Sequence, residues 1–262
     1  MRPIIWLTIL LISGLSHPCW AQQFRFETQI YLDGETEAAS ENTTLFADGL
    51  VFDIQSKGSQ THEVAILDPH RRQIFLLDRF REVKLQLDEI HLIKMADSLR
   101  KQTATNKAAG FLINDRFEEH VDYNTGTATL TSPIIKYTVR GRRPSDVRML
   151  PQYNQFADYF TRMKFSDPQA FPPFPRLRLN ETLSKLGWIP TEVVIDIGEN
   201  MLFKQGLKAT SKHTLVPNLS DKDLATITRL KAQWLNFKLV SLDDYRGLGQ
   251  RVAEKQSSKE AR

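Results

Sequence analysis

The sequence predicts an α+β protein built on a mainly antiparallel β-sheet, and three observations lead to this prediction. Segments in which apolar and polar residues alternate, as in strands, come in consecutive blocks. Segments with apolar residues at helical spacing stand between and after these blocks, and they do not follow each strand in turn. Short turn signals such as Asp-Gly separate neighbouring strand segments, as in hairpins. Segregated blocks of this kind favour α+β over a parallel α/β arrangement.

The first strand block runs from residue 24 to residue 87. Phe24–Tyr31 alternates with a period of two and is followed by turn chemistry at Asp33-Gly34. Residues 43–54 form one long strand, or two short strands that meet at Asp48-Gly49. Further strands are expected at 62–67, 73–78 and 82–87, and the alternation in the last is typical of a meander with one buried face.

A helix and a second strand block come next. Asp88 is the expected N-cap of a helix over residues 89–102. Its apolar stripe is built on Ile90, Ile93 and Ala96 and is broadened by Leu92, Met95 and Leu99. The strands of the second block are expected at 117–123, 128–131 and 134–140.

The remaining elements are three helices and a hairpin. Apolar residues at helical spacing predict helices over 152–165 and 176–186, and Gly187 suits the left-handed position that ends the second. The other expected elements are a hairpin of strands 191–197 and 201–215 and a helix that Asp221 caps and that runs to about Phe237.

Residues 1–21 are typical of a secretory signal peptide. Arg2 supplies the positive start, Ile4–Leu15 is apolar, and the small residue Ala21 precedes Gln22. We therefore predict cleavage between Ala21 and Gln22 and export to the periplasm or the medium. The single cysteine leaves with this segment, so no disulfide is expected. Residues 22–250 are expected to form one domain, and residues 251–262 a solvated tail.

The net charge and the hydropathy of the chain indicate which kinds of partner to expect. The whole chain has a formal net charge of +4, with acidic and basic residues interspersed. A nucleic-acid-binding protein usually shows a basic stripe or a strong basic excess, so no nucleic acid is expected as a partner. The apolar run in the signal peptide is shorter than the roughly 20 residues that span a bilayer, and we expect a protein that does not span the membrane.

The most suggestive polar cluster is Asp68-Pro69-His70 between two apolar runs. Asp68 and His70 have the chemistry of an acid–base pair or of metal ligands. The alternative is a hairpin turn in which proline and aspartate shape the backbone. We favour the turn, because Arg71-Arg72 would place positive charge beside a bound cation.

Other catalytic and metal-binding signals are weak. The histidines lack metal-ligand spacing, although Glu118 and His120 share one face of a strand. There is no Gly-x-Ser-x-Gly elbow and no cysteine after residue 21. Carboxylates such as Asp48 and Asp53 remain candidates for a hydrolase whose site assembles only in space. We therefore predict no catalytic residue, no metal site and no cofactor.

Several strands carry large apolar residues on both faces, which indicates a sheet covered on both sides. Helices can cover one face, while the other can enclose a filled core or a pocket for an acyl chain or similar ligand. Both readings stay open. The candidate residues that would line such a pocket are Phe46, Phe52, Phe75 and Leu77.

Three strings carry a resemblance: FETQIYLDGETEAASENTTLFADGLVFDI, VAILDPHRRQIFLLD and FPPFPRLRLNETLSKLGWIPTEVVI. Together they resemble a group of exported bacterial proteins of uncharacterised function, over most of the chain after residue 21. The Asp-Pro turn and the Ile-Pro step in IPTEVVI are also similar to periplasmic lipoprotein carriers. That likeness implies a curved, half-barrel-like antiparallel sheet over helices, with an apolar cavity. The chain departs from those carriers because it lacks an opening helix.

The expected function is that of an exported, non-enzymatic protein that binds a lipid, another hydrophobic ligand or an envelope partner. Two alternatives remain. One is an envelope hydrolase with spatially assembled carboxylates, and the other is a structural or partner-binding envelope protein with a filled core.

Overall fold

The computed structural model describes residues 22–57, 60–104, 113, 116–163, 173–199 and 206–247. These residues form an α+β fold with one large sheet of 12 strands, and the predicted class is confirmed. The strands are β1 (Phe24–Leu32), β2 (Ser40–Ala47), β3 (Leu50–Lys57), β4 (Gln60–Asp68), β5 (Gln73–Asp78), β6 (Val83–Asp88), β7 (Glu118–Asp122), β8 (Thr127–Thr131), β9 (Ile135–Arg142), β10 (Ile189–Ile197), β11 (Leu207–Val216) and β12 (Lys238–Leu239). The helices are α1 (Glu89–Ala104), α3 (Met149–Met163), α4 (Phe174–Leu186), α5 (Asp221–Asn236) and α6 (Leu242–Tyr245).

The sheet is unclosed, and its strand order is β12-β6-β5-β4-β3-β2-β1-β11-β10-β9-β8-β7. Neighbouring strands are antiparallel, except that β12 runs parallel to β6. The strand β1 joins the two halves of the chain, because it pairs with β2 on one side and with β11 on the other. The second pairing brings Thr28 opposite His213.

Two predicted turns are present in the structure. Asp48 and Gly49 both have positive φ, 54° and 74°, so residues 43–54 form two strands joined by a tight turn. The Asp-Pro-His-Arg segment joins β4 and β5 as a hairpin, as predicted. There the Asp68 carboxylate accepts a hydrogen bond of 3.0 Å from the backbone N–H of Arg71. The turn reading of this cluster is confirmed.

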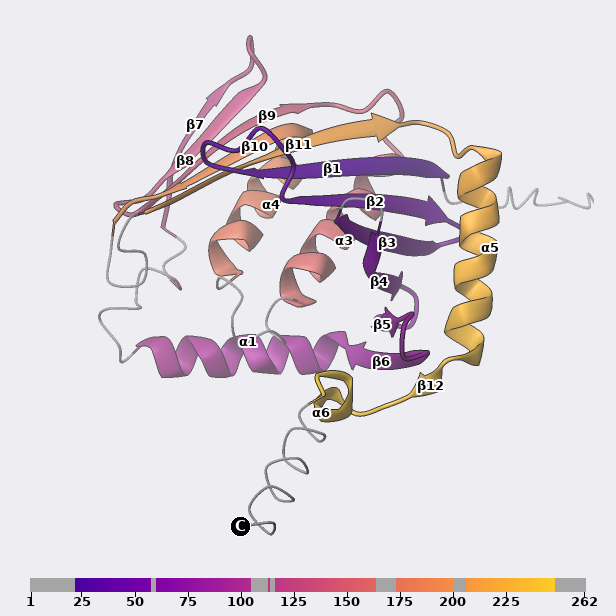
Figure 1. Ribbon diagram of the computed structural model, residues 1–262. Helices are drawn as coiled ribbons and strands as arrows, with labels where there is room; N and C mark the ends of the chain where they lie inside the picture. Colours follow the sequence, from indigo (N-terminus) through magenta and orange to yellow (C-terminus); the bar gives the residue numbers. More distant parts are fainter. Residues whose placement is uncertain are drawn as a thin grey trace, which may run out of the picture.

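One face of the sheet is covered by α1, α3 and α4. In Figure 1, α3 and α4 lie beneath the strands at the top of the view, and α1 runs below them. The core on this side contains Phe24 and Phe46, whose rings stack with centroids 4.0 Å apart. The ring of Phe156 from α3 packs against Phe46 at 5.6 Å.

The opposite face of β2 to β5 is covered by α5, at the right of Figure 1. Strand alternation places Leu45 and Phe52 on this side, where they pack with Ile227 and Leu230 of α5. The predicted covering of both faces is confirmed for this part of the sheet. A third cluster lies between α4 and the strands β8 to β10.

Two helix predictions need correction. In α1, Leu92 is fully buried, whereas Ile90 is 58% exposed, so the buried stripe starts from Leu92. The orientation of α1 is set by the buried carboxylate of Glu89, which is paired with Arg72 at 2.5 Å and accepts a hydrogen bond from Tyr159 at 2.8 Å. The N-cap of α5 is Ser220 and not Asp221.

The C-terminal part of the described chain adds elements that the sequence did not predict. The strand β12 extends the sheet beside β6, and α6 follows it. The guanidinium of Arg81 donates hydrogen bonds to the backbone carbonyls of Asp244 and Tyr245 in α6. The predicted signal peptide (1–21) and tail (251–262) lie outside the described residues.

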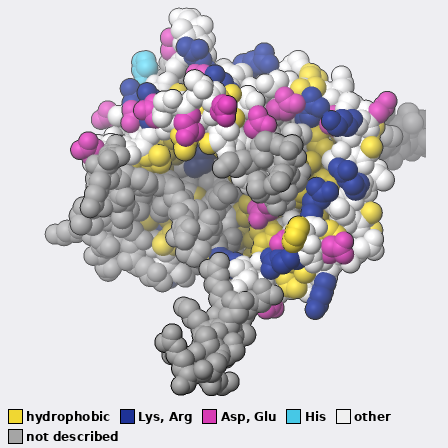
Figure 2. Space-filling view, in the orientation of Figure 1, with side chains coloured by type: hydrophobic (Ala, Val, Ile, Leu, Met, Phe, Trp, Pro, Cys, Tyr) yellow, Lys and Arg dark blue, Asp and Glu magenta, His cyan; other side chains and the backbone are white. Residues whose placement is uncertain are grey.

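The surface carries charges of both signs. In Figure 2, basic and acidic side chains are interspersed over the described part of the visible face. None of the described helices is both long enough and apolar enough to cross a bilayer.

Candidate functional site

The four apolar residues predicted to line a pocket lie in two cores on opposite faces of the sheet. Phe46 is fully buried between Phe24 and Phe156 on the side of α3. Phe52, Phe75 and Leu77 lie beneath α5, on the other face, where Phe75 packs against Trp234 with centroids 4.9 Å apart. The cavity between the sheet and the helices α3 and α4 is lined by other residues.

This cavity has a volume of about 320 Å³. One wall consists of β1, β2, β3 and β11, and the other consists of α3 and the first turn of α4. Both walls carry aromatic side chains. Phe26 lies on the strand side, with its ring centroid 5.0 Å from that of Tyr153, and Phe156 and Phe160 project from α3. The surface of the cavity is therefore mostly apolar.

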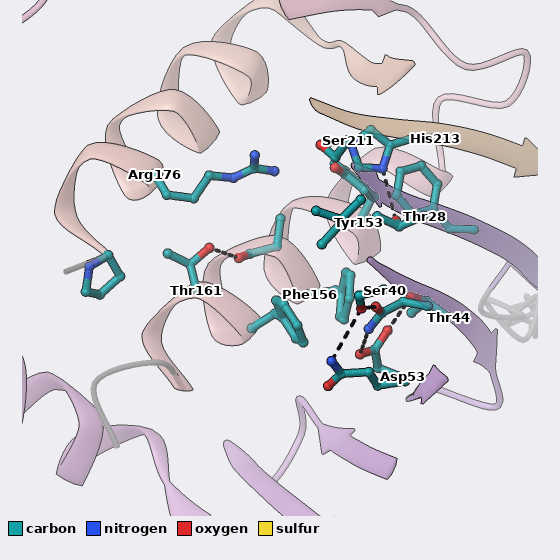
Figure 3. Close-up of a pocket in the computed structure, with 17 residues that line it drawn as sticks. Thr28, Ser40, Thr44, Asp53, Tyr153, Phe156, Thr161, Arg176, Ser211 and His213 are labelled. Atoms are coloured by element: carbon teal, nitrogen blue, oxygen red, sulfur yellow. Dashed lines mark hydrogen bonds between the residues drawn. The ribbon is translucent and has the colours of Figure 1, made fainter. Parts of the chain in front are cut away.

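One end of the cavity is formed by Arg176, Tyr153, Ser211 and His213. Figure 3 shows the side chain of Arg176 extending from α4 toward the other three. Its Nε donates a hydrogen bond of 3.1 Å to Oδ1 of Asn180, one turn further along the helix. Asn180 in turn donates to Asp158 at 3.1 Å. Asn180 thus holds one edge of the guanidinium and leaves the terminal nitrogens toward the cavity.

His213 is held as a neutral imidazole. Its Nδ1 lies 3.0 Å from the hydroxyl oxygen of Thr28, and its Nε2 lies 3.0 Å from that of Ser211. Burial, and after it the positive charge of Arg176, lower the pKa of His213 to about 3. A neutral imidazole donates through one nitrogen and accepts through the other, and a hydroxyl can supply either partner. Both ring nitrogens are therefore satisfied without a proton being added.

Tyr153 is a buried residue that lines the same part of the cavity. The residue is 4% exposed. No group in the described part of the chain forms a hydrogen bond with its hydroxyl. Burial raises the pKa of Tyr153 to about 12, and the nearby charge of Arg176 opposes part of that rise. The hydroxyl consequently keeps its proton at neutral pH and can donate it to a hydrogen bond.

The sheet wall of the cavity includes Asp53 of β3. Its carboxylate accepts hydrogen bonds from Thr44 at 2.6 Å and from Asn42 at 2.9 Å. Ser40 and Gln55 lie beside this group. Figure 3 shows Asp53 with Ser40 and Thr44, away from Arg176. The cavity therefore carries a guanidinium on its helix wall and the carboxyl group of Asp53 on its sheet wall, where Thr28 lies opposite both His213 and Asn42.

The other polar candidates are not brought together. The carboxylate of Asp48 forms an ion pair of 2.8 Å with Lys231 on the surface. The carboxylate of Asp68 accepts a hydrogen bond from the backbone N–H of Arg71 within the turn between β4 and β5. His70 lies beside Gly49, and Glu118 and His120 are exposed on β7. Of Asp48, Asp53, Asp68, His70 and His120, only Asp53 lines the cavity between the sheet and the helices α3 and α4. Within the ranges that the structure describes, no three metal-ligating residues are close enough to hold an ion.

Sequence reasoning found Asp53 but missed Arg176, Tyr153 and His213. One sequence signal of the cavity was present in β1, where Phe26, Thr28 and Ile30 share a face. A polar residue between two apolar residues on the same face indicates that this face contacts water or polar groups. The convergence itself had no sequence signal, since β1, β11, α3 and α4 lie far apart in the chain.

Comparison with known proteins assigns this chain to no family. No protein-family model matches the chain, and a search of curated proteins finds no significant match.

Proposed function

We propose that this protein is exported and binds a hydrophobic ligand in the cavity between the sheet and the helices α3 and α4. The observation that carries the proposal is the cavity itself, whose surface is mostly apolar and includes Phe26, Phe156 and Phe160, with its polar side chains mainly on the strand wall. Ligand sites are typically concave and mostly apolar, with a few polar groups that orient the ligand.

The size of the cavity supports a small ligand. Its volume of about 320 Å³ lies at the lower end of the roughly 300–1,000 Å³ that is usual for ligand pockets. It is about twice the roughly 150 Å³ of an engineered apolar cavity that binds benzene. A single alkyl chain of medium length, on the order of ten to twelve carbons, is a suitable occupant by this comparison.

A half-barrel-like sheet is part of the proposal. The unclosed antiparallel sheet supports it, as does the position of α3 and α4 together on one face (Figure 1). The export step rests on the signal-like residues 1–21 of the sequence. Cleavage between Ala21 and Gln22 would leave the first described strand, β1, intact.

A hydrolase is the alternative that one contact favours, because Ser211 and His213 are spaced like a nucleophile and its base. A histidine that takes a serine proton must become an imidazolium, which a carboxylate usually stabilises. Here the other ring nitrogen, Nδ1, contacts the hydroxyl of Thr28 and not a carboxylate. Burial and the positive charge of Arg176 also disfavour the imidazolium form of His213. The surroundings of His213 therefore support binding over hydrolysis.

The experiment is native mass spectrometry of the full chain, expressed with its own leader and extracted mildly. We expect a polypeptide that begins at Gln22 and that carries a copurified apolar molecule. The matched variant is Ala157→Leu, which adds volume at a residue that lines the cavity. The control is Leu235→Ala, because Leu235 is exposed on α5.

The results of this experiment distinguish ligand binding from hydrolysis. The wild type and the Leu235→Ala variant should retain the ligand, and the Ala157→Leu variant should lose most of it. If no apolar ligand copurifies and neither dodecan-1-ol nor dodecanoate binds when added, the proposed function is wrong. Cleavage of p-nitrophenyl dodecanoate that is lost in a Ser211→Ala variant would favour the hydrolase instead.

A further inference from the structure

We infer that the ligand of this cavity is an amphiphile with a single carboxylate, such as a medium-chain fatty acid, and that Arg176 and Tyr153 bind the carboxylate. The inference rests on the proposed function and names the chemistry of its ligand. It assigns the carboxylate to the part of the cavity at α4 and the alkyl chain to the apolar surface.

Arg176 places a positive charge at the cavity wall. Among the described residues, no Asp or Glu forms an ion pair with its guanidinium. Other arginines of α3 and α4 are paired: Arg178 with Glu119 and Glu181, and Arg162 with Glu89 and Asp158. A partly buried cation without a counterion is costly, because the charge has lost part of its hydration. A ligand carboxylate would supply the missing counterion.

The hydroxyl of Tyr153 is a second group that a ligand can bind. Tyr153 is a buried residue that lines the cavity, and its hydroxyl has no partner in the described part of the chain. The hydroxyl is therefore available to donate a hydrogen bond to a ligand oxygen. A carboxylate has two oxygens, one for the guanidinium and one for the phenol. A single ligand group therefore satisfies both protein groups.

Asp53 lies on the sheet wall of the cavity, away from Arg176. A ligand carboxylate placed beside it would meet carboxyl oxygens that already accept hydrogen bonds from Asn42 and Thr44. Because Asp53 is already bonded to Asn42 and Thr44, it does not need a ligand group. The guanidinium of Arg176 thus gives the ligand one direction, with its carboxylate at α4. Phe26, Phe156 and Phe160 would then contact the chain.

The test measures binding of three probes with the same chain: dodecanoate, dodecan-1-ol and dodecyltrimethylammonium. Each is titrated into the mature protein by calorimetry, at pH 7 and below the concentration at which it forms micelles. We expect dodecanoate to bind at least about 10-fold more tightly than dodecan-1-ol, since a hydrogen bond to a charged group contributes roughly 1.5–3 kcal/mol. The cationic probe should bind most weakly.

Single-residue variants show which side chains cause the preference for dodecanoate over dodecan-1-ol. Arg176→Gln should reduce the affinity for dodecanoate by about 10-fold or more while leaving that for dodecan-1-ol within about 2-fold. Tyr153→Phe should reduce the affinity for dodecanoate by about 3- to 10-fold. The matched control is Lys185→Gln, which removes a positive charge from the exposed side of α4. This control should change neither affinity.

The possible failures are distinguishable. If the alcohol binds as tightly as the acid, or if the cationic probe binds best, the carboxylate inference is overturned and the proposed function stands. If none of the three probes binds, both are wrong. The comparison of probes in the wild type requires no variant, so the test holds even if Arg176→Gln does not fold.

Discussion

Individual residues give the cavity its polarity. Arg176 is held by Asn180 and brings a positive charge close to Tyr153 and His213. Burial, and after it this charge, keep His213 neutral, whereas burial alone raises the pKa of Tyr153 and keeps its proton in place. Every polar group at this end is thus fixed in the form that accommodates an anion or a neutral donor. A second cation there would be strongly disfavoured.

The low pKa of His213 predicts a pH dependence of stability. The unfolded chain has an ordinary histidine pKa of about 6.5, whereas folding lowers the pKa of His213 to about 3. Below pH 6.5 the unfolded state binds a proton that the folded state does not, so stability falls as pH decreases toward 3. Above pH 6.5 the contribution is constant.

The measurement is urea unfolding of the wild type and of His213→Gln at pH 7 and pH 5. The wild type should lose up to about 2 kcal/mol more than the variant between these two pH values. Titration of the remaining histidines and acids is shared by both proteins and cancels in the comparison. Equal losses in the two proteins would show that His213 titrates normally in the folded state.

At the scale of elements, local sequence signals determine where strands and helices begin and end. Asp48-Gly49 turns one apolar segment into two paired strands, and Gly187 ends α4 with a left-handed φ of 66°. In α5, Ser220 and Asp223 cap each other: the serine side chain accepts from the Asp223 N–H, and the Asp223 carboxylate accepts from the Ser220 N–H at 2.8 Å. Sequence reasoning placed this cap one residue late, at Asp221.

The capping box of α5 predicts the effect of Ser220→Ala. Loss of the serine oxygen leaves the N–H of Asp223 without its partner and should reduce the free energy of unfolding by about 1 kcal/mol. The control is Thr228→Ala, which removes an exposed hydroxyl from the same helix. Thermal or urea unfolding compares the two, and an effect of Ser220→Ala no larger than that of the control would contradict this role.

At the scale of the molecule, the sheet separates two apolar regions. The face toward α3 carries the cavity, and the face beneath α5 carries a core in which Leu77 is fully buried. Protein cores are close-packed, so deletion of a buried side chain costs stability wherever it occurs. Ligand affinity, by contrast, should respond only to changes on the cavity face.

Leu77→Ala tests this division. We expect a loss of about 2–5 kcal/mol in the free energy of unfolding, typical of a buried leucine replaced by alanine. The affinity of the folded variant for dodecan-1-ol should stay within about 2-fold of the wild type. Unfolding in urea and calorimetry measure the two quantities. A large loss of affinity in a fully folded variant would mean that the two faces are coupled.

The sequence by itself determined the α+β class, the turns and the approximate bounds of most described elements, because residue period and turn chemistry act over a few neighbouring positions. It also indicated that apolar residues face both sides of the sheet. Only the tertiary structure decided which of them fill a core and which leave a cavity, because a buried phenylalanine has the same pattern in both. The pairing of β1 with β11 and the packing of α3 and α4 brought Arg176, Tyr153 and His213 together from segments far apart in the chain. Such convergence depends on long-range contacts and has no local signature.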